Sequence, residues 1–289
     1  MSTATITPAQ ITGVPATLSL ELTGRCQLEC RHCFASSGPT GDHGTMTMDD
    51  WREVIDLATV VGVRKIQFIG GDPTTHPGLP DLIVHALAAG LKVRVFTNLV
   101  AVPERLWDAL TLPGVTVATS YYTPDPVRHD EITGRKGSHA RTRRNIVEAL
   151  RREVPLHVAL LDTGSEADVN AAHAELLALG VTDIGRDRVR PLGRAAAGAE
   201  PDPAALCGRC GITQAVVLPD GTLAPCGMGR WLAAGNVRTT PLDELLAGER
   251  WRSALAAVPR QNADGCNPDA DGEDCSPAER PPCQPEWDA

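Results

Sequence analysis

The chain has 289 residues, which allows one large domain or a large domain with a smaller one. Hydrophobic residues make up 42% and charged residues 22%, so gross disorder is excluded. The net charge is −9 and no long basic stripe occurs, so we expect no nucleic-acid partner. Because neither a transmembrane run nor a secretory signal is visible, we expect a cytoplasmic protein with no membrane partner and with reduced thiols.

After an N-terminal segment, residues 1–16, strand-like runs alternate with helical patterns. The predicted strands are 18–22, 65–70, 92–98, 115–122, 156–162 and 183–189. Parallel strands need a crossover connection, usually a helix, so this alternation predicts an α/β fold with a parallel sheet. A closed eight-unit barrel needs roughly 250 residues. Six units fit residues 17–195 better, as a partial (β/α)6 TIM-like barrel.

Four helices are predicted between these strands, at 47–62, 79–90, 140–152 and 166–180. The first begins at Thr47, a good N-cap residue, and ends at Gly62. Its residues Trp51, Val54 and Ile55 fall on one face, as in a helix that packs on a sheet. In such folds the active site lies at the carboxyl ends of the strands.

Composition shifts after residue 195, and residues 196–289 form a small Cys-rich C-terminal extension. Residues 195–204 are typical of a linker, and 215–226 predict a hairpin with its turn at Asp220–Gly221. A helix is predicted over 242–258. The tail from Gln261 is rich in Pro, Asp and Cys, and we expect it to be ordered only if a metal tethers it.

Nine cysteines gather at the two ends of the chain, with none between 34 and 206. A disulfide framework is disfavoured in a reducing compartment, and nine is an odd number. Buried thiols of no chemical interest would not cluster in this way. The pattern therefore indicates metal or iron–sulfur ligation.

The first group, Cys26, Cys30 and Cys33, directly follows the first predicted strand. Three thiolates on a short loop can hold three irons of a [4Fe–4S] cube and leave the fourth open to a substrate or cosubstrate. The alternative is a structural zinc site, which prefers four ligands and would use His32 and His43.

This spacing resembles that of the radical S-adenosylmethionine (SAM) superfamily. At the next strand end, Gly70-Gly71-Asp72-Pro73 is similar to the family's Gly-Gly-Glu-Pro motif, which binds the methionyl amino group. Asp72 stands where the family has Glu. We expect Gly71 to lie where the backbone approaches the methionine moiety. The alternative for these four residues is an ordinary βα turn.

The resemblance extends to single residues that it implies in SAM binding. Thr97-Asn98 is similar to the family's Thr-Asn-Gly, and Ser120 stands where the family uses a Ser near the ribose or carboxylate. His32 precedes the third Cys, where the family often packs an aromatic residue near adenine; a solvated loop His is the alternative. Arg141 either lies near the SAM carboxylate or on a solvated helix face. A second group of basic residues lies at or just after the sixth predicted strand: Arg186, Arg188, Arg190 and Arg194. These arginines could contact SAM or an acidic substrate, and a purely structural role is the alternative.

The second group, Cys207, Cys210 and Cys226, resembles the opening of the SPASM or Twitch extension, which carries auxiliary clusters. The tail departs from the full SPASM spacing, so we expect one auxiliary [4Fe–4S] cluster with Cys266 as its fourth ligand. A remaining tail cysteine, Cys275 or Cys283, is a candidate hydrogen donor to a product radical. The alternative for the tail is a zinc site or unliganded thiols.

The resemblance implies an enzyme that reductively cleaves SAM to a 5′-deoxyadenosyl radical, which abstracts a hydrogen from a substrate. It favours a ribosomally made peptide that is crosslinked, epimerised or oxidised. The rival is a small molecule such as an aminoglycoside or sugar, epimerised or dehydrogenated. Implied partners are an electron donor such as flavodoxin or ferredoxin and a separate leader-peptide-binding protein. A non-catalytic iron–sulfur or zinc protein is the alternative of another class.

Overall fold

One open sheet organises the part of the chain that the computed structural model describes, residues 14–260. Its strand order is β6-β5-β4-β3-β2-β1-β7-β8-β9, and β1 to β6 run parallel. The first six strands are β1 Thr17–Glu21, β2 Lys65–Ile69, β3 Lys92–Phe96, β4 Val115–Tyr121, β5 Leu156–Asp162 and β6 Asp183–Arg188. The predicted partial parallel barrel is confirmed, and every predicted strand is present.

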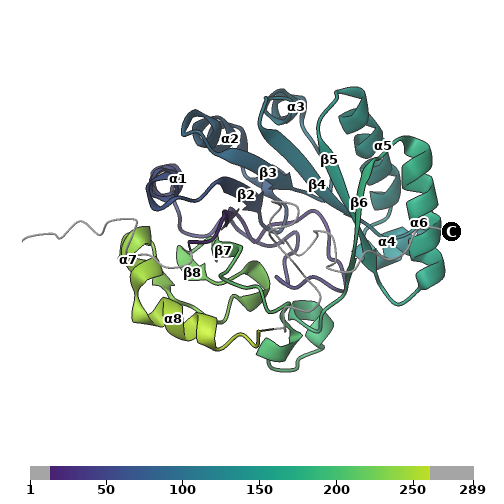
Figure 1. The fold of residues 1–289 in the computed structure, drawn as a ribbon. Coiled ribbons are helices and arrows are strands. Elements are labelled where there is room, and N and C mark those ends of the chain that lie inside the picture. Colours follow the sequence, from purple (N-terminus) through teal and green to yellow (C-terminus); the bar gives the residue numbers. More distant parts are fainter. Residues whose placement is uncertain (1–13, 261–289) are drawn as a thin grey trace, which may run out of the picture.

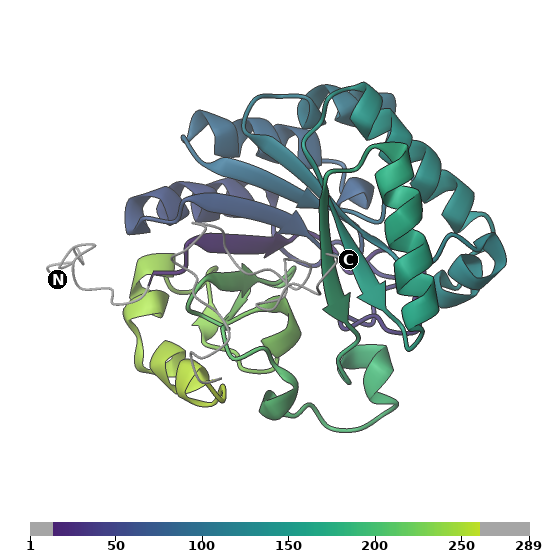
Figure 2. The same ribbon diagram turned by 45° about the vertical axis from the view of Figure 1, so that its right-hand side comes forward.

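Helices cover the outer face of this curved sheet (Figures 1 and 2). They are α1 Met48–Val61, α2 Leu79–Ala88, α3 Glu104–Leu110, α4 Pro126–Thr133, α5 Ser138–Arg151 and α6 Glu166–Leu179. All four predicted helices occur, and α3 and α4 were not predicted because each is too short to display an amphipathic period. Among residues 14–260, no helix has the length and apolarity to cross a membrane.

Helix α1 shows how the local sequence fixes these elements. Thr47 accepts a hydrogen bond from the Asp50 amide, and the Asp50 carboxylate accepts one from the Thr47 amide, which completes a capping box. Gly62 ends the helix with φ of 96°. Trp51 is fully buried against the sheet.

The two faces of β1 differ in chemistry. Leu18 and Leu20 join the main apolar core beneath the helices. Successive side chains of a strand point to opposite faces, so Ser19 and Glu21 lie on the inner face. Both are buried, and Ser19 Oγ accepts a hydrogen bond of 3.3 Å from Gln67. The inner face is therefore partly polar, in contrast to the outer one.

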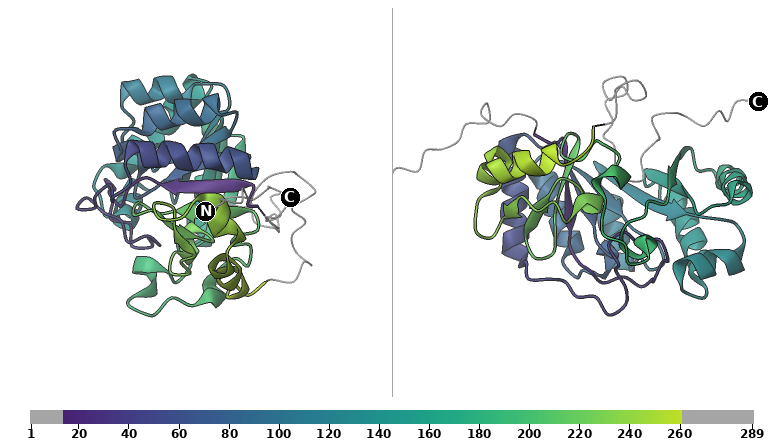
Figure 3. Two further views of the ribbon diagram at one scale, coloured as in Figure 1. Left: turned by 90° about the vertical axis from the view of Figure 1, so that its left-hand side faces the viewer. Right: turned by 90° about the horizontal axis from the view of Figure 1, so that it is seen from below.

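The C-terminal extension continues the same sheet. β7, Gln214–Val217, pairs parallel with β1, a contact that the sequence did not predict. β8, Thr222–Ala224, runs antiparallel to β7, so the predicted hairpin is confirmed, and β9, Gly235–Asn236, follows. Viewed from two further directions, this segment lies at the β1 edge of the barrel (Figure 3).

The single helix predicted over 242–258 is wrong, because the chain forms two. α7, Leu242–Ala247, packs against α1, and α8, Glu249–Ala256, follows it. Gly248 between them is extended, with φ −74° and ψ 160°. Four 3-10 turns complete the description: η2 Pro73–Thr75, η3 Gly193–Ala196, η4 Pro203–Ala205 and η5 Gly227–Gly229. The predicted linker 195–204 begins in η3 and ends in η4, with irregular chain from 197 to 202.

Candidate functional site

The first cysteine group lies on the long loop that follows β1, at the carboxyl end of the sheet. Cys26 is buried, and Cys30 and Cys33 are half-buried. The Cys26 amide donates to the Gly38 carbonyl at 2.9 Å, and the Cys33 amide donates to the Cys30 carbonyl at 3.2 Å. These bonds fold the loop back on itself, and the three thiols lie close enough to one another to interact electrostatically.

The loop is also tied to the rest of the barrel. The Glu29 and Arg31 amides donate to carbonyls in the last turn of α4. From the far side, Arg194 donates from Nε to the Cys30 carbonyl at 2.8 Å and from its amide to the Cys33 carbonyl at 3.0 Å. The ligand loop is thereby held from both sides, which a fixed set of ligands requires.

The surroundings of these thiols suit a metal cluster. Leu28 and Val100 pack against Cys26 and Cys30 in a small apolar cluster. Burial raises the pKa of both Cys26 and Cys30 to about 12. Such thiols deprotonate when iron binds and compensates the charge.

The same cysteine loop does not form a site for a single metal ion such as zinc. Within residues 14–260, no group of three His, Cys, Asp or Glu side chains is arranged around one metal ion. His43, proposed above as a fourth zinc ligand, instead bonds Thr23 through Nδ1 at 2.9 Å. The thiolates of a cube bind different irons, so their sulfurs need not meet at one point.

The Gly70–Pro73 turn after β2 is bonded directly to the start of the cysteine loop. Gly71 donates to the Thr23 carbonyl at 2.7 Å, and Asp72 donates to the Arg25 carbonyl at 2.8 Å. A Cβ at Gly71 would stand 2.4 Å from the Arg25 carbonyl oxygen and 2.8 Å from that of Gly24. The cysteine loop therefore requires a glycine at this position.

The Asp72 carboxylate binds other groups of the protein. It is 1% exposed and accepts hydrogen bonds from the Thr74 amide at 2.9 Å, the Thr97 hydroxyl at 2.9 Å and the Asn98 amide at 2.8 Å. Burial raises its pKa despite these donors. Asp72 thus joins the ends of β2 and β3, and Pro73 opens η2 behind it.

Asn98 contacts the cysteine loop. Its Nδ2 lies 3.5 Å from Cys26 Sγ and 2.9 Å from Gln27 Oε1. The next residue, Leu99, is fully buried and has a φ of 55°, where the resembled motif has Gly. Such a conformation costs about 1–3 kcal/mol and persists where surrounding contacts enforce it. Here Asn145 donates to the Leu99 carbonyl at 2.6 Å.

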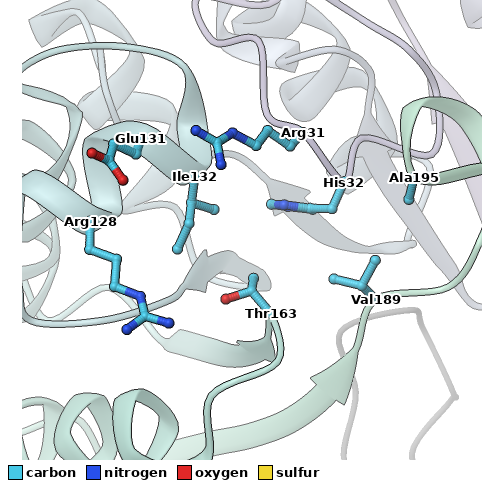
Figure 4. Close-up of a pocket in the computed structure, with 8 residues that line it drawn as sticks. All are labelled: Arg31, His32, Arg128, Glu131, Ile132, Thr163, Val189 and Ala195. Carbon is cyan, nitrogen blue, oxygen red and sulfur yellow. The ribbon is translucent and has the colours of Figure 1, made fainter. Parts of the chain in front are cut away.

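A cavity of about 350 Å³ opens beside the cysteine loop, and residues from five segments of the chain line it (Figure 4). His32 borders it from the loop, Ile132 from α4, Thr163 after β5 and Val189 after β6. The His32 ring packs against Tyr122 with 5.1 Å between centroids. Burial, aided by the positive charge of Arg194, lowers the pKa of His32 to about 4. His32 is therefore a neutral aromatic wall of this cavity.

The structure places the remaining predicted residues as follows. Ser120 is half-buried near the end of β4, and Arg141 is exposed on α5. Arg186 pairs with Asp162 at 2.9 Å and Arg190 with Asp187 at 3.0 Å. Three of the four arginines near β6 therefore bind other groups of the protein: Arg186 and Arg190 through these ion pairs, and Arg194 through the contacts given above.

The cysteines of the second group, Cys207, Cys210 and Cys226, also lie close together. Cys210 and Cys226 are buried with their sulfurs 2.9 Å apart, and hydrogen bonds to Cys207 and Cys226 raise the pKa of Cys210. The Gly229 amide donates to Cys226 Sγ at 3.2 Å. An apolar cluster encloses the group: Leu192, Leu206, Val258 and, at its border, Phe34, Met228 and Trp231.

Arg230 connects the two cysteine groups. It follows η5 after Cys226 and forms an ion pair with Glu21 of β1 at 2.7 Å. Its guanidinium lies 5.7 Å from the ring centre of Phe34, the residue after Cys33. Burial raises the pKa of Glu21, although Arg230 opposes that shift. Sequence reasoning missed this trio, because its members are far apart in the chain.

The described chain ends beside the second group. Arg260 donates from Nη1 to the carbonyls of Gly208 and Cys210 at 2.9 and 3.0 Å. Cys266, Cys275 and Cys283 lie outside the described residues, as does most of the segment 1–16.

The fold and the paired cysteine groups define a class of protein. A family model of the radical SAM superfamily matches residues 20–171, and one of the SPASM iron–sulfur cluster-binding domain matches 207–276. The chain belongs to the radical SAM superfamily and carries a SPASM domain, as the resemblance predicted. The cofactors that this class implies are SAM, its [4Fe–4S] cluster and an auxiliary iron–sulfur cluster.

Particular relatives are similar over parts of their length. A PqqA peptide cyclase of Xanthomonas axonopodis pv. citri is 33% identical over 145 residues, which cover 50% of this chain and 39% of the relative. SuiB of Streptococcus suis bound to precursor peptide SuiA has a TM-score of 0.73 at 14% identity, covering 88% of this chain and 69% of that one. The anSMEcpe structure with bound AdoMet and Cp18Cys peptide has a TM-score of 0.66 at 16% identity, covering 87% and 86%. The two structures confirm the fold.

Proposed function

We propose that this chain is a cytoplasmic enzyme that binds a [4Fe–4S] cluster through Cys26, Cys30 and Cys33 and cleaves SAM reductively. The main support for this proposal is that the Gly70–Pro73 turn is hydrogen-bonded to the backbone of the cysteine loop. When bound, the cluster supplies the electron that splits SAM into methionine and a 5′-deoxyadenosyl radical.

The chain's own residues then bind and orient SAM. The backbone of Gly70–Pro73, beside the triad, receives the methionine moiety, while Asp72 acts as a positioning residue that joins β2 to β3. The neutral ring of His32 and the cavity beneath it receive the adenine. Ser120 and Arg141 remain proposed contacts of the ribose and carboxylate. Leu28 and Val100 exclude water from the cysteine side.

The second cysteine group holds an auxiliary [4Fe–4S] cluster. Cys207, Cys210 and Cys226 supply three ligands inside an apolar shell. Arg260 fixes the chain beside that group only six residues before Cys266, so we propose Cys266 as the fourth ligand. Cys275 or Cys283 remains the candidate hydrogen donor.

Single alanine variants of the tail cysteines separate these roles. Cys266→Ala loses auxiliary iron, whereas a hydrogen-donor variant keeps its iron, cleaves SAM and fails to release product. Unchanged iron and product in all three variants contradict both assignments.

The substrate we propose is a ribosomally made peptide that is crosslinked, epimerised or oxidised. Support comes from the relatives, which include a peptide cyclase and two peptide-bound structures. Electrons come from a flavodoxin or ferredoxin, and a separate protein binds the leader peptide.

The test of substrate class incubates the reduced, SAM-loaded enzyme with a precursor peptide encoded next to its gene. The proposal predicts a SAM-dependent change in the peptide's mass or, for an epimerisation in deuterated water, a gain of one deuterium. If the peptide is unchanged while an aminoglycoside or sugar substrate is converted, the peptide assignment is wrong.

A further inference from the structure

We propose that Tyr122 and Asn98 set the reduction potential of the cluster at the first cysteine group, by donating hydrogen bonds to the sulfurs of Cys30 and Cys26. This inference rests on the proposed function, because it concerns the cluster that those cysteines hold. Both act in this inference as positioning residues, because their effect on the cluster passes through its cysteine ligands.

Asn98 is fixed so that its amide nitrogen faces sulfur. Its Oδ1 accepts a hydrogen bond from the Val100 amide at 2.8 Å, which assigns the oxygen end of the side chain. The two hydrogens on Nδ2 then point to Cys26 Sγ at 3.5 Å and Gln27 Oε1 at 2.9 Å. A flipped side chain would place oxygen against both the sulfur and the Gln27 oxygen.

Tyr122 is fixed by the rings around it. It is 7% exposed and packs between His32 and His129, each 5.1 Å away between ring centroids. Its hydroxyl interacts with the Cys30 thiol, an interaction that lowers the pKa of Cys30 and raises that of Tyr122. A phenol has one proton and a thiolate has none, so in the ligated state Tyr122 is the donor.

The neighbouring residue provides a natural control. Tyr121 and Tyr122 are the only two tyrosines of the chain, and adjacent residues of a strand point to opposite faces. The Tyr121 hydroxyl accordingly bonds Glu175 at 2.6 Å and His139 at 2.8 Å, between the sheet and the helices. Removing it perturbs the same strand without touching a cysteine.

The direction of the effect follows from charge. Reduction adds one electron to a cluster whose thiolates are already negative, so a donor to sulfur stabilises the reduced form more than the oxidised form. Loss of one donor lowers the equilibrium constant of reduction by up to about tenfold, which for one electron corresponds to about 59 mV. The hydrogen bonds therefore make this cluster easier to reduce.

The experiment is a potentiometric titration, followed by EPR, of the reconstituted full-length enzyme. The signal of this cluster is the one that changes when SAM is added. Tyr122→Phe is expected to shift its potential downward by several tens of millivolts, with unchanged iron content, while Tyr121→Phe matches wild type. Asn98→Ala is expected to shift it in the same direction, and Gln27→Ala, which keeps the bond from Asn98 to Cys26, is its control.

The measured potentials decide whether Tyr122 and Asn98 tune the cluster. If Tyr122→Phe and Asn98→Ala both titrate with the wild-type potential, neither residue tunes the cluster. If Tyr121→Phe shifts the potential as much as Tyr122→Phe, the effect belongs to the strand and not to the hydrogen bond. If no signal responds to SAM in the wild type, the proposed function fails and the inference with it.

Discussion

Gly71→Ala tests whether Gly71 is needed for the packing of the Gly70–Pro73 turn against the cysteine loop. Its Cβ would lie 2.4 Å from the Arg25 oxygen and 2.6 Å from the Arg25 carbon, both backbone atoms that no rotamer change can move. Overpacking of this kind costs about 1–3 kcal/mol. The bonds from Gly71 to Thr23 and from Asp72 to Arg25 would stretch, at about 1 kcal/mol each.

A total of about 3 kcal/mol lowers the Tm of a chain of this size by roughly 6–12 °C. The displaced loop carries Cys26, so iron at the first cysteine group and SAM affinity should fall together. The assay combines a thermal melt, iron per chain and SAM binding by calorimetry. Gly24→Ala is the matched control, because it modifies the opposite side of the same contact and its Cβ meets only the Asp42 oxygen at 3.7 Å. A Gly71→Ala protein with wild-type Tm and iron content would show that the close contact with Arg25 does not hold the cysteine loop in place.

Two other predictions concern stability. Arg230→Met leaves Glu21 buried without its partner and is expected to cost about 2–4 kcal/mol; a Glu21→Leu/Arg230→Met double variant that melts no higher than Arg230→Met contradicts this account. Burial lowers the pKa of His129 to about 4, so below its unfolded value of about 6.5 the unfolded state takes up the proton first and stability falls as the pH drops toward 4. His129→Phe should therefore show a smaller loss of Tm between pH 7 and pH 5 than wild type, and an equal loss would count against the assignment.

The strands and the longer helices were predictable because their signals are local. Thr47, Asp50 and Gly62 specify the ends of α1 within sixteen residues, and the β-branched runs specify the strands. The break at Gly248 was missed, since the apolar positions on either side continue one helical pattern.

The composition of the site was predictable, but its internal contacts were not. The sequence singled out the loop of Cys26, Cys30 and Cys33 and the Gly70–Pro73 turn, and the structure places the two side by side. The interior role of Asp72 depends on Thr97 and Asn98, which reach it only because β2 and β3 are neighbours. Tyr122 gave no sequence signal beyond its place at the end of a strand.

The extension shows the same limit on a larger scale. The hairpin was visible in the sequence, but the pairing of β7 with β1 joins residues about 200 positions apart. Such a contact is decided by burial of the β1 edge and by the packing of α7 on α1. No period or local motif encodes it.

In the proposed function, the first cysteine group holds the cluster at which SAM is cleaved. The most direct measurement compares wild type with a Cys26→Ala/Cys30→Ala/Cys33→Ala variant, both reconstituted anaerobically and reduced in the presence of SAM. Wild type is predicted to form 5′-deoxyadenosine and methionine, whereas the variant forms neither, loses the iron of one cluster and keeps the iron at Cys207, Cys210 and Cys226. Continued formation of 5′-deoxyadenosine by the triple variant would contradict the account.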